Sequence, residues 1–248
     1  MATSVRRGPY HGLMAKVVVQ FTCTECGTTT GRWLGRCPGC SAFGTLVEEL
    51  QGRDTATSSS RPAVPTRLAD VAVEEAERIP TGVPELDRVL SGGLVPGSVT
   101  LVGGEPGIGK STLLLQATAA MAAAGACALY VSAEESKQQV RLRAARLGTA
   151  DAVEILAETE LDVVCATLAE LRPDVCVIDS VQTLYASALG SAPGSVAQVR
   201  EAASRLLRVS KESGVATVLV GHVTKDGAVA GPRVLAHLVD CDLQIEGD

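Results

Sequence analysis

The run GEPGIGKS at residues 104–111 combines glycines, a lysine and a serine at a spacing that suits phosphate chemistry. It fits the pattern GxxxxGKS/T in full, with the apolar run VTLVG before it and a helical pattern after it. The glycines let successive backbone N–H groups close around phosphate oxygens, and the N-terminus of the following helix adds partial positive charge. The residues expected to bind ATP are Gly104, Glu105, Pro106, Gly107, Ile108, Gly109, Lys110, Ser111 and Thr112.

Two residues of this loop and one later aspartate are expected to handle the charge of the phosphates. Lys110 should reach the β- and γ-phosphates, and the Ser111 hydroxyl should hold Mg²⁺. Asp179 ends the apolar run CVID, and a carboxylate at the end of a strand beside the phosphate loop can hold the hydration shell of magnesium. We therefore predict Ser111 and Asp179 as the magnesium residues.

Two glutamates in YVSAEES, residues 130–136, are candidates for the base that hydrolyses ATP. Hydrolysis needs a carboxylate that orients or deprotonates water, and the end of a strand next to the γ-phosphate is a suitable position. We expect Glu134 to be this base, with Glu135 as the alternative. Both residues would also simply favour the start of the next helix.

A third set of polar residues follows the apolar run VLVG at residues 218–221. His222 and Lys225 lie where they could sense the γ-phosphate or reach across a subunit boundary. A single histidine is also a common structural residue, so both interpretations of His222 stay open. Arg233, in the glycine-rich stretch that follows, is available for a phosphate contact.

Two CxxC pairs lie ten residues apart in FTCTECGTTTGRWLGRCPGC, residues 21–40. This is the ligand number and spacing for tetrahedral Zn²⁺. Because this knuckle is too small to bury a core of its own, the metal should supply most of its folding free energy, of order 10 kcal/mol. The expected zinc ligands are Cys23, Cys26, Cys37 and Cys40.

The remaining cysteines and the single tryptophan have less specific patterns. Trp33, flanked by Arg32 and Arg36, would either stack on a nucleic-acid base or pack on the knuckle, and packing is favoured. The other four cysteines lie in apolar runs, which is typical of small buried hydrophobic side chains. They are Cys127, Cys165, Cys176 and Cys241.

Composition excludes several classes of protein. The chain has 248 residues, 46% of them hydrophobic, but no apolar run near the roughly 18 residues of a membrane span. Residues 1–13 lack the apolar region of a secretory signal, so we expect a cytoplasmic protein with reduced thiols. The net charge is −6, yet the part up to Arg67 holds eight Lys and Arg against four Asp and Glu. This asymmetry is weak support for a nucleic acid meeting the N-terminal part.

The elements that must position these residues alternate along the second part of the chain. Apolar runs predict buried strands, and longer periodic runs predict helices, with Ser136 as an N-cap and Gly148 past a helix end. This alternation predicts an α/β fold, a mainly parallel sheet with helices on both faces. The predicted strands are 98–102, 126–131, 153–156, 175–178, 216–220 and 243–245. The predicted helices are 112–124, 136–147, 161–171 and 195–213.

These motifs together resemble a known family. The run from Thr81 to Gln116 is similar to the start of RecA-type ATPase cores, and its combination with a four-cysteine finger resembles the bacterial DNA repair proteins called RadA or Sms. YVSAEES, VCVIDSVQTLYASALGSAPGSVAQVRE and GHVTKDGAVAGPRVLAHLVD agree in order and spacing. The resemblance covers about residues 14–248.

The resemblance implies an ATP-driven motor on single-stranded DNA that acts with RecA on branched recombination intermediates, and a hexameric ring in the full-length family. Glu134 matches the catalytic glutamate of RecA-type cores. Lys225 and Arg233 fall in or near DNA-facing loops, so they are the candidates for DNA contact. The implied order is a non-native or disordered leader at 1–13, a finger at 14–47, a linker at 48–67 and a RecA-like ATPase domain at 68–248.

One departure weakens these expectations. Members of the family continue with a Lys-Asn-Arg-Phe-Gly motif and a Lon-protease-like domain, whereas this sequence stops at IEGD. We therefore expect hydrolysis or DNA remodelling by this length of chain to be reduced. Two alternatives to a DNA-dependent ATPase stay open: a RecA-like ATPase that acts on protein partners, and a fragment that binds nucleotide without turnover.

Overall fold

A parallel sheet forms the centre of the larger part of the molecule. The computed structural model describes residues 18–23, 26–51, 67, 70, 77–149, 153–222 and 235–247. Within them, a six-stranded, all-parallel sheet has the order β6-β5-β7-β8-β4-β9. Its strands are β4 (Val99–Gly104), β5 (Ala128–Ser132), β6 (Glu154–Ala157), β7 (Val175–Asp179), β8 (Ala216–Val220) and β9 (Cys241–Ile245).

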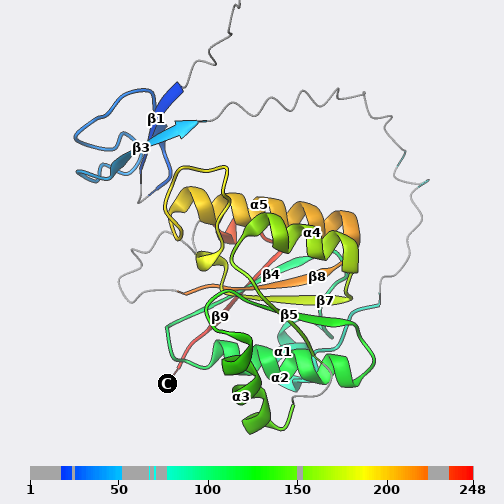
Figure 1. The fold of residues 1–248 in the computed structure, drawn as a ribbon. Coiled ribbons are helices and arrows are strands. Elements are labelled where there is room, and N and C mark those ends of the chain that lie inside the picture. Colours follow the sequence, from blue (N-terminus) through cyan, green and yellow to red (C-terminus); the bar gives the residue numbers. More distant parts are fainter. Residues whose placement is uncertain are drawn as a thin grey trace, which may run out of the picture.

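Helices cover both faces of this sheet. Figure 1 shows α4 and α5 on one face and α1, α2 and α3 on the other, which confirms the predicted α/β architecture. The helices are α1 (Pro84–Val89), α2 (Lys110–Ala123), α3 (Lys137–Leu147), α4 (Leu161–Leu171) and α5 (Val196–Ser213), with a 3₁₀ turn at Val181–Thr183.

The strands at the centre of the sheet are continuous apolar runs because they are buried on both sides. All residues of β4, β5, β7 and β8 are buried. Successive side chains point to opposite faces, so Leu101 packs in the cluster under α4 and α5, and Val102 packs in the cluster under α2. Such two-sided burial is what parallel sheets with crossover helices require.

Local signals set the ends of the helices. Ser136 caps α3, since its side chain accepts a hydrogen bond from the Gln139 amide while the Gln139 side chain accepts one from the Ser136 amide. Gly148 ends the same helix with a φ of 68°, a left-handed conformation that glycine adopts without strain. Both residues do what the sequence predicted.

A separate small sheet holds the N-terminal cysteines. Its strands are β1 (Val18–Cys23), β2 (Thr29–Thr30) and β3 (Leu46–Gln51), in the order β2-β1-β3 and antiparallel. Its buried apolar cluster consists of Cys23, Cys37 and Leu46, and the two cysteines are themselves expected ligands. A protein core of this size stabilises little on its own.

The structure corrects one expectation about the cysteines. Cys165 and Cys176 are buried, but Cys127 is exposed and Cys241 is only partly buried. Cys127 lies one residue before β5, and its amide donates to the Asp174 carboxylate at the rim of the sheet. An apolar run can therefore extend past the buried part of its strand.

A membrane-crossing segment is not found in the described part of the chain, where every helix is too short or too polar to span a bilayer.

Candidate functional site

The phosphate loop joins the end of β4 to the start of α2. Gly107 and Gly109 have φ values of 82° and 104°, and α2 begins at Lys110, two residues before the sequence predicted. A Cβ at Gly104 would lie 2.8 Å from the carbonyl oxygen of Ile245 on β9, so only glycine fits where these strands meet. The first turn of α2 thus carries Lys110, Ser111 and Thr112 directly behind the glycines.

Lys110 lies at the centre of this loop. Its side chain is buried, and Nζ donates to the carbonyl oxygens of Gly104 and Glu105, both at 2.8 Å. Burial lowers the pKa of Lys110, while the nearby Asp179 and Glu134 carboxylates oppose that change. The cation therefore faces two carboxylates across the space beside the loop.

Asp179 is held by one oxygen and leaves the other available. It ends β7 and is buried, and its Oδ2 accepts a 2.6 Å hydrogen bond from the Tyr130 hydroxyl on β5. Burial and the neighbouring Asp179 raise the pKa of Tyr130, so the phenol stays protonated and donates. Oδ1 is buried and has no hydrogen-bond partner among the described residues. A buried carboxylate oxygen without a hydrogen-bond partner is a suitable ligand for Mg²⁺ or for the water molecules around it.

The two candidate glutamates lie in different surroundings. Glu134 Oε1 accepts hydrogen bonds from the Ser180 hydroxyl and from His222 Nε2, the latter at 3.1 Å. The hydrogen bond from His222 lowers the pKa of Glu134, and Ser180 and Lys110 lower it further. Glu134 is therefore an ionised carboxylate, and it lies close enough to Lys110 for the two charges to attract each other.

Glu135 is occupied elsewhere. Its carboxylate forms an ion pair with Arg143 of α3, and its backbone is bonded to the Ser132 hydroxyl in both directions. An ion pair with α3 directs this side chain away from the role of a base. The geometry favours Glu134 over Glu135.

His222 enters the site because of the strand order. β8 lies between β7 and β4, so the two residues after β8 emerge between Asp179 and the phosphate loop. His222 Nδ1 is buried without a hydrogen-bond partner among the described residues. Lys225 and Arg233, the candidates for DNA contact, lie outside the described residues.

Three residues of this site were missed by the sequence reasoning: Tyr130, Ser180 and Arg143. Tyr130 opens the YVSAEES run and Ser180 follows Asp179 directly, so both were adjacent to assigned residues. No sequence pattern pointed to Arg143, because its ion pair with Glu135 depends on how α3 packs in the folded protein.

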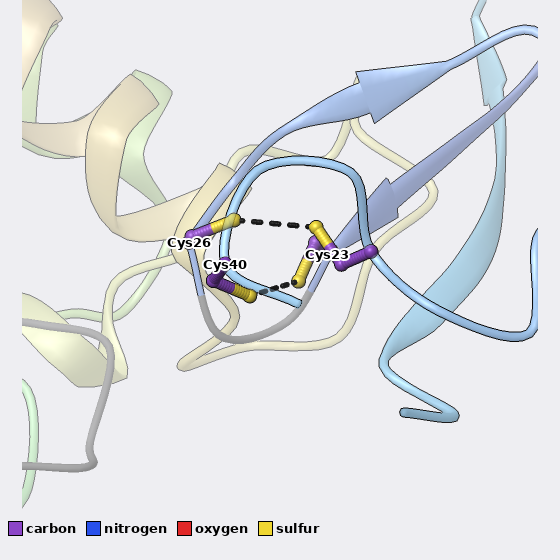
Figure 2. A group of neighbouring side chains, drawn as sticks. Cys23, Cys26 and Cys40 are labelled. Carbon is purple, nitrogen blue, oxygen red and sulfur yellow. Dashed lines mark hydrogen bonds between the residues drawn. The ribbon is translucent and has the colours of Figure 1, made fainter. Parts of the chain in front are cut away.

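The four N-terminal cysteines converge on one point. Their sulfur atoms all lie within 4.8 Å of one another, with Cys23 to Cys40 at 3.7 Å and Cys26 to Cys37 at 3.5 Å. Tetrahedral zinc with Zn–S bonds of about 2.3 Å separates its sulfur ligands by about 3.8 Å. Figure 2 shows Cys23, Cys26 and Cys40 with their sulfur atoms turned toward a common centre.

Backbone amides favour the thiolate form that a metal binds. The Gly39 amide donates to Cys37 Sγ at 3.3 Å. Backbone hydrogen bonds at Cys40 and Gly39 lower the pKa of the Cys37 thiol to about 6. Because zinc binds thiolates, a lowered pKa of Cys37 favours metal binding by this cluster.

These features define a RecA-like ATPase core joined to a four-cysteine zinc-binding cluster. The AAA domain family matches residues 62–228, and the rubredoxin metal binding domain family matches residues 21–48. The sequence is 51% identical to the DNA repair protein RadA of Pseudomonas aeruginosa over 241 residues and 44% identical to that of Bacillus subtilis over 243. The chain belongs to the RadA family of DNA repair proteins.

The relatives are longer than this chain. Each of the two alignments spans 95% of this chain and 53% of the relative, so the chain spans about half the length of the curated relatives it matches. Among solved structures, one described as an ATPase domain is similar, with a TM-score of 0.58 and 15% identity over 70% of this chain and 77% of that one. That likeness supports the fold.

Proposed function

We propose that this chain binds ATP with Mg²⁺ at the 104–112 loop and hydrolyses it in a reaction that single-stranded DNA stimulates. The observation that carries the proposal is the meeting of Lys110, Asp179 and Glu134 at one edge of a parallel sheet. Three different strands deliver these residues, so the arrangement depends on the fold and not on one local motif.

Each residue has a distinct role in the proposed reaction. The loop amides and the start of α2 bind the phosphates, and Lys110 neutralises the charge that develops on the γ-phosphate oxygens. Ser111 and Asp179 Oδ1 would hold Mg²⁺, which supplies further neutralisation of the phosphate charge when bound. Glu134 orients the attacking water and accepts its proton.

Ser180 and His222 hold Glu134 in place through the same carboxylate oxygen. Both bonds favour the ionised form of Glu134, which is the form that a base requires. The attacking water would bind the other oxygen, Oε2. His222 is thus proposed as a positioning residue for the base.

The partners of the reaction are proposed from family membership. The relatives are DNA repair proteins, which favours a cytoplasmic motor that processes branched DNA together with RecA as a hexameric ring. Lys225 and Arg233 are the proposed cations on DNA. With a net charge of −6, contact with DNA must come from such local cations.

Phosphate release by the zinc-loaded chain, with and without single-stranded DNA, tests this proposal. We expect DNA to raise the rate, and Lys110→Ala to abolish turnover in either condition. Turnover that DNA leaves unchanged would support an ATPase acting on protein partners. ATP binding without any turnover would support a nucleotide-binding fragment, and either result contradicts the proposal.

A further inference from the structure

We propose that the zinc-binding part of the chain carries its own contact surface for single-stranded DNA, formed by Trp33, Phe43, Arg32 and Arg36. We call these four residues the ribbon surface. The inference rests on the proposed function and adds a second DNA contact, remote in sequence from Lys225 and Arg233.

The exposure of the aromatic side chains is the first observation. Trp33 is 58% exposed and Phe43 is 77% exposed, although aromatic residues make up only 2% of the chain. The aromatic residues of the ATPase core in the described ranges are Tyr130, which is buried, and Tyr185, which is half-buried. Trp33 contacts the knuckle at Gly35, as expected, but more than half of its side chain stays exposed and is available to a ligand.

The two aromatic residues belong to one small structure. Arg36 and Phe43 pair as an antiparallel bridge, and the neighbouring Gly44 amide donates to the Gly35 carbonyl at 3.1 Å. The tip of the Trp33 indole lies over Gly35, 3.8 Å from where a Cβ would stand. Backbone pairing thus fixes Phe43 next to the residue that the indole covers.

The position of the cations beside the rings favours a nucleic acid as the occupant. Between Cys26 and Val47 the sequence contains two arginines, Arg32 and Arg36, and no aspartate or glutamate. Both arginines are exposed. Arg36 lies with its guanidinium carbon 5.3 Å from the centre of the Phe43 ring, and its Nε donates to the Ser41 carbonyl at 3.0 Å. A fixed cation beside exposed rings is the combination that binds single strands, because phosphates meet the cation and bases stack on the rings.

The metal connects this surface to the fold. Cys37 follows Arg36 directly, and the Cys37 amide donates to the Ala42 carbonyl at 2.8 Å, next to Phe43. Zinc binding by Cys37 and Cys40 would therefore fix one end and the middle of the turn that joins Arg36 to Phe43. The zinc-binding cluster thus holds the ribbon surface in a shape on which nucleic-acid bases can stack.

Trp33 is the only tryptophan in the chain, so its fluorescence reports on this surface alone. We would titrate the zinc-loaded chain with oligo(dT), following tryptophan emission and, in parallel, the anisotropy of a labelled oligo(dT). The expected result is quenching of the emission with the same midpoint as the anisotropy change. Trp33→Ala and Phe43→Ala should each weaken binding about 5- to 150-fold, the range for one stacked base.

Matched variants separate the ribbon surface from general effects. Leu142→Ala and Arg88→Ala remove a similarly exposed apolar side chain and a similarly exposed arginine from the ATPase core, and they should leave binding unchanged. Arg36→Ala should lower the slope of log affinity against log salt by about 0.7, the contribution of one phosphate contact. Zinc content, measured by metal release, should be unchanged in Trp33→Ala and Phe43→Ala.

The outcomes distinguish this inference from the proposed function. Binding of oligo(dT) that leaves Trp33 emission unchanged, with Trp33→Ala binding as tightly as the wild type, overturns the ribbon surface and preserves the DNA-dependent ATPase. Absence of any binding overturns both. A change of Trp33 emission with purified RecA but not with oligo(dT) also overturns the inference, since it assigns the surface to a protein.

Discussion

Replacement of Tyr130 by phenylalanine tests how the magnesium carboxylate is positioned. The hydroxyl of Tyr130 donates to Asp179 Oδ2 at 2.6 Å, and both side chains are buried, so no water can readily replace the bond. The change keeps the ring and its packing and removes only the donor. We expect Asp179 to lose its fixed orientation and to offer Oδ1 less effectively to Mg²⁺.

The size of the effect follows from the kind of bond. A hydrogen bond to a charged group contributes about 1.5–3 kcal/mol. If that contribution is felt at the metal, the Mg²⁺ concentration for half-maximal turnover rises by about 10- to 100-fold, since about 1.4 kcal/mol is a factor of ten. The maximal rate at saturating Mg²⁺ should change much less.

Two measurements check this prediction. Turnover is measured against Mg²⁺ concentration, and binding of a fluorescent ATP analogue is measured with Mg²⁺ and with EDTA. The variant should bind the analogue like the wild type in EDTA and more weakly with limiting Mg²⁺. Tyr185→Phe, which removes a hydroxyl that is not bonded to Asp179, is the matched control.

An unchanged or lower Mg²⁺ requirement in Tyr130→Phe would refute the reasoning. It would mean that the sheet alone fixes the orientation of Asp179. Alternatively, it would mean that the phenol weakens Mg²⁺ binding by drawing charge from the carboxylate, and that this effect outweighs the benefit of positioning it. Urea unfolding without nucleotide should show whether a loss of stability accompanies either result.

Further predictions concern the base and the zinc-binding cluster. Glu134→Gln should lower turnover at least 100-fold with ATP binding retained, whereas Glu135→Gln should have a much smaller effect, as measured by phosphate release. Because the pKa of Glu134 lies below its ordinary value, its contribution to stability is present above that ordinary value and is lost only as the pH falls through the lowered pKa. The acid limb of the pH–rate profile should therefore lie on the acid side of the ordinary glutamate range, and His222→Gln should move it upward. Cys26→Ser, or removal of zinc by a chelator, should unfold residues around the cluster and leave the thermal unfolding of the ATPase core nearly unchanged, as measured by metal release and calorimetry.

The phosphate loop and the elements of the core could be predicted from the sequence because their signals are local. Each predicted strand of the core lies within two residues of an observed one at its start or its end. For β4, β5, β7 and β8 the reason is that a strand buried on both faces must be apolar throughout. A serine and a glycine mark the two ends of α3. The four zinc-binding cysteines were likewise predicted from spacing alone, and their sulfur atoms converge.

The contacts that depend on strand order could not be predicted. Tyr130 meets Asp179 because β5 lies next to β7, and His222 reaches Glu134 because β8 lies on the other side of β7. No local pattern in the sequence indicates which strands are neighbours in the sheet. The strands of the small N-terminal sheet were also missed, and β2 has only two residues, too few to show any alternation.

The pairing of β4 with β9 has a consequence for the order in which the chain acquires its sites during synthesis. Gly103 and Gly104 pair with Gln244 and Ile245, about 140 residues further along, so the strand that supports the phosphate loop stays open on one side until the ribosome has released β9. The cysteine cluster needs only residues up to Cys40 and can take up zinc long before. A nascent chain would thus be metal-loaded early and competent for nucleotide only once β9 has joined the sheet.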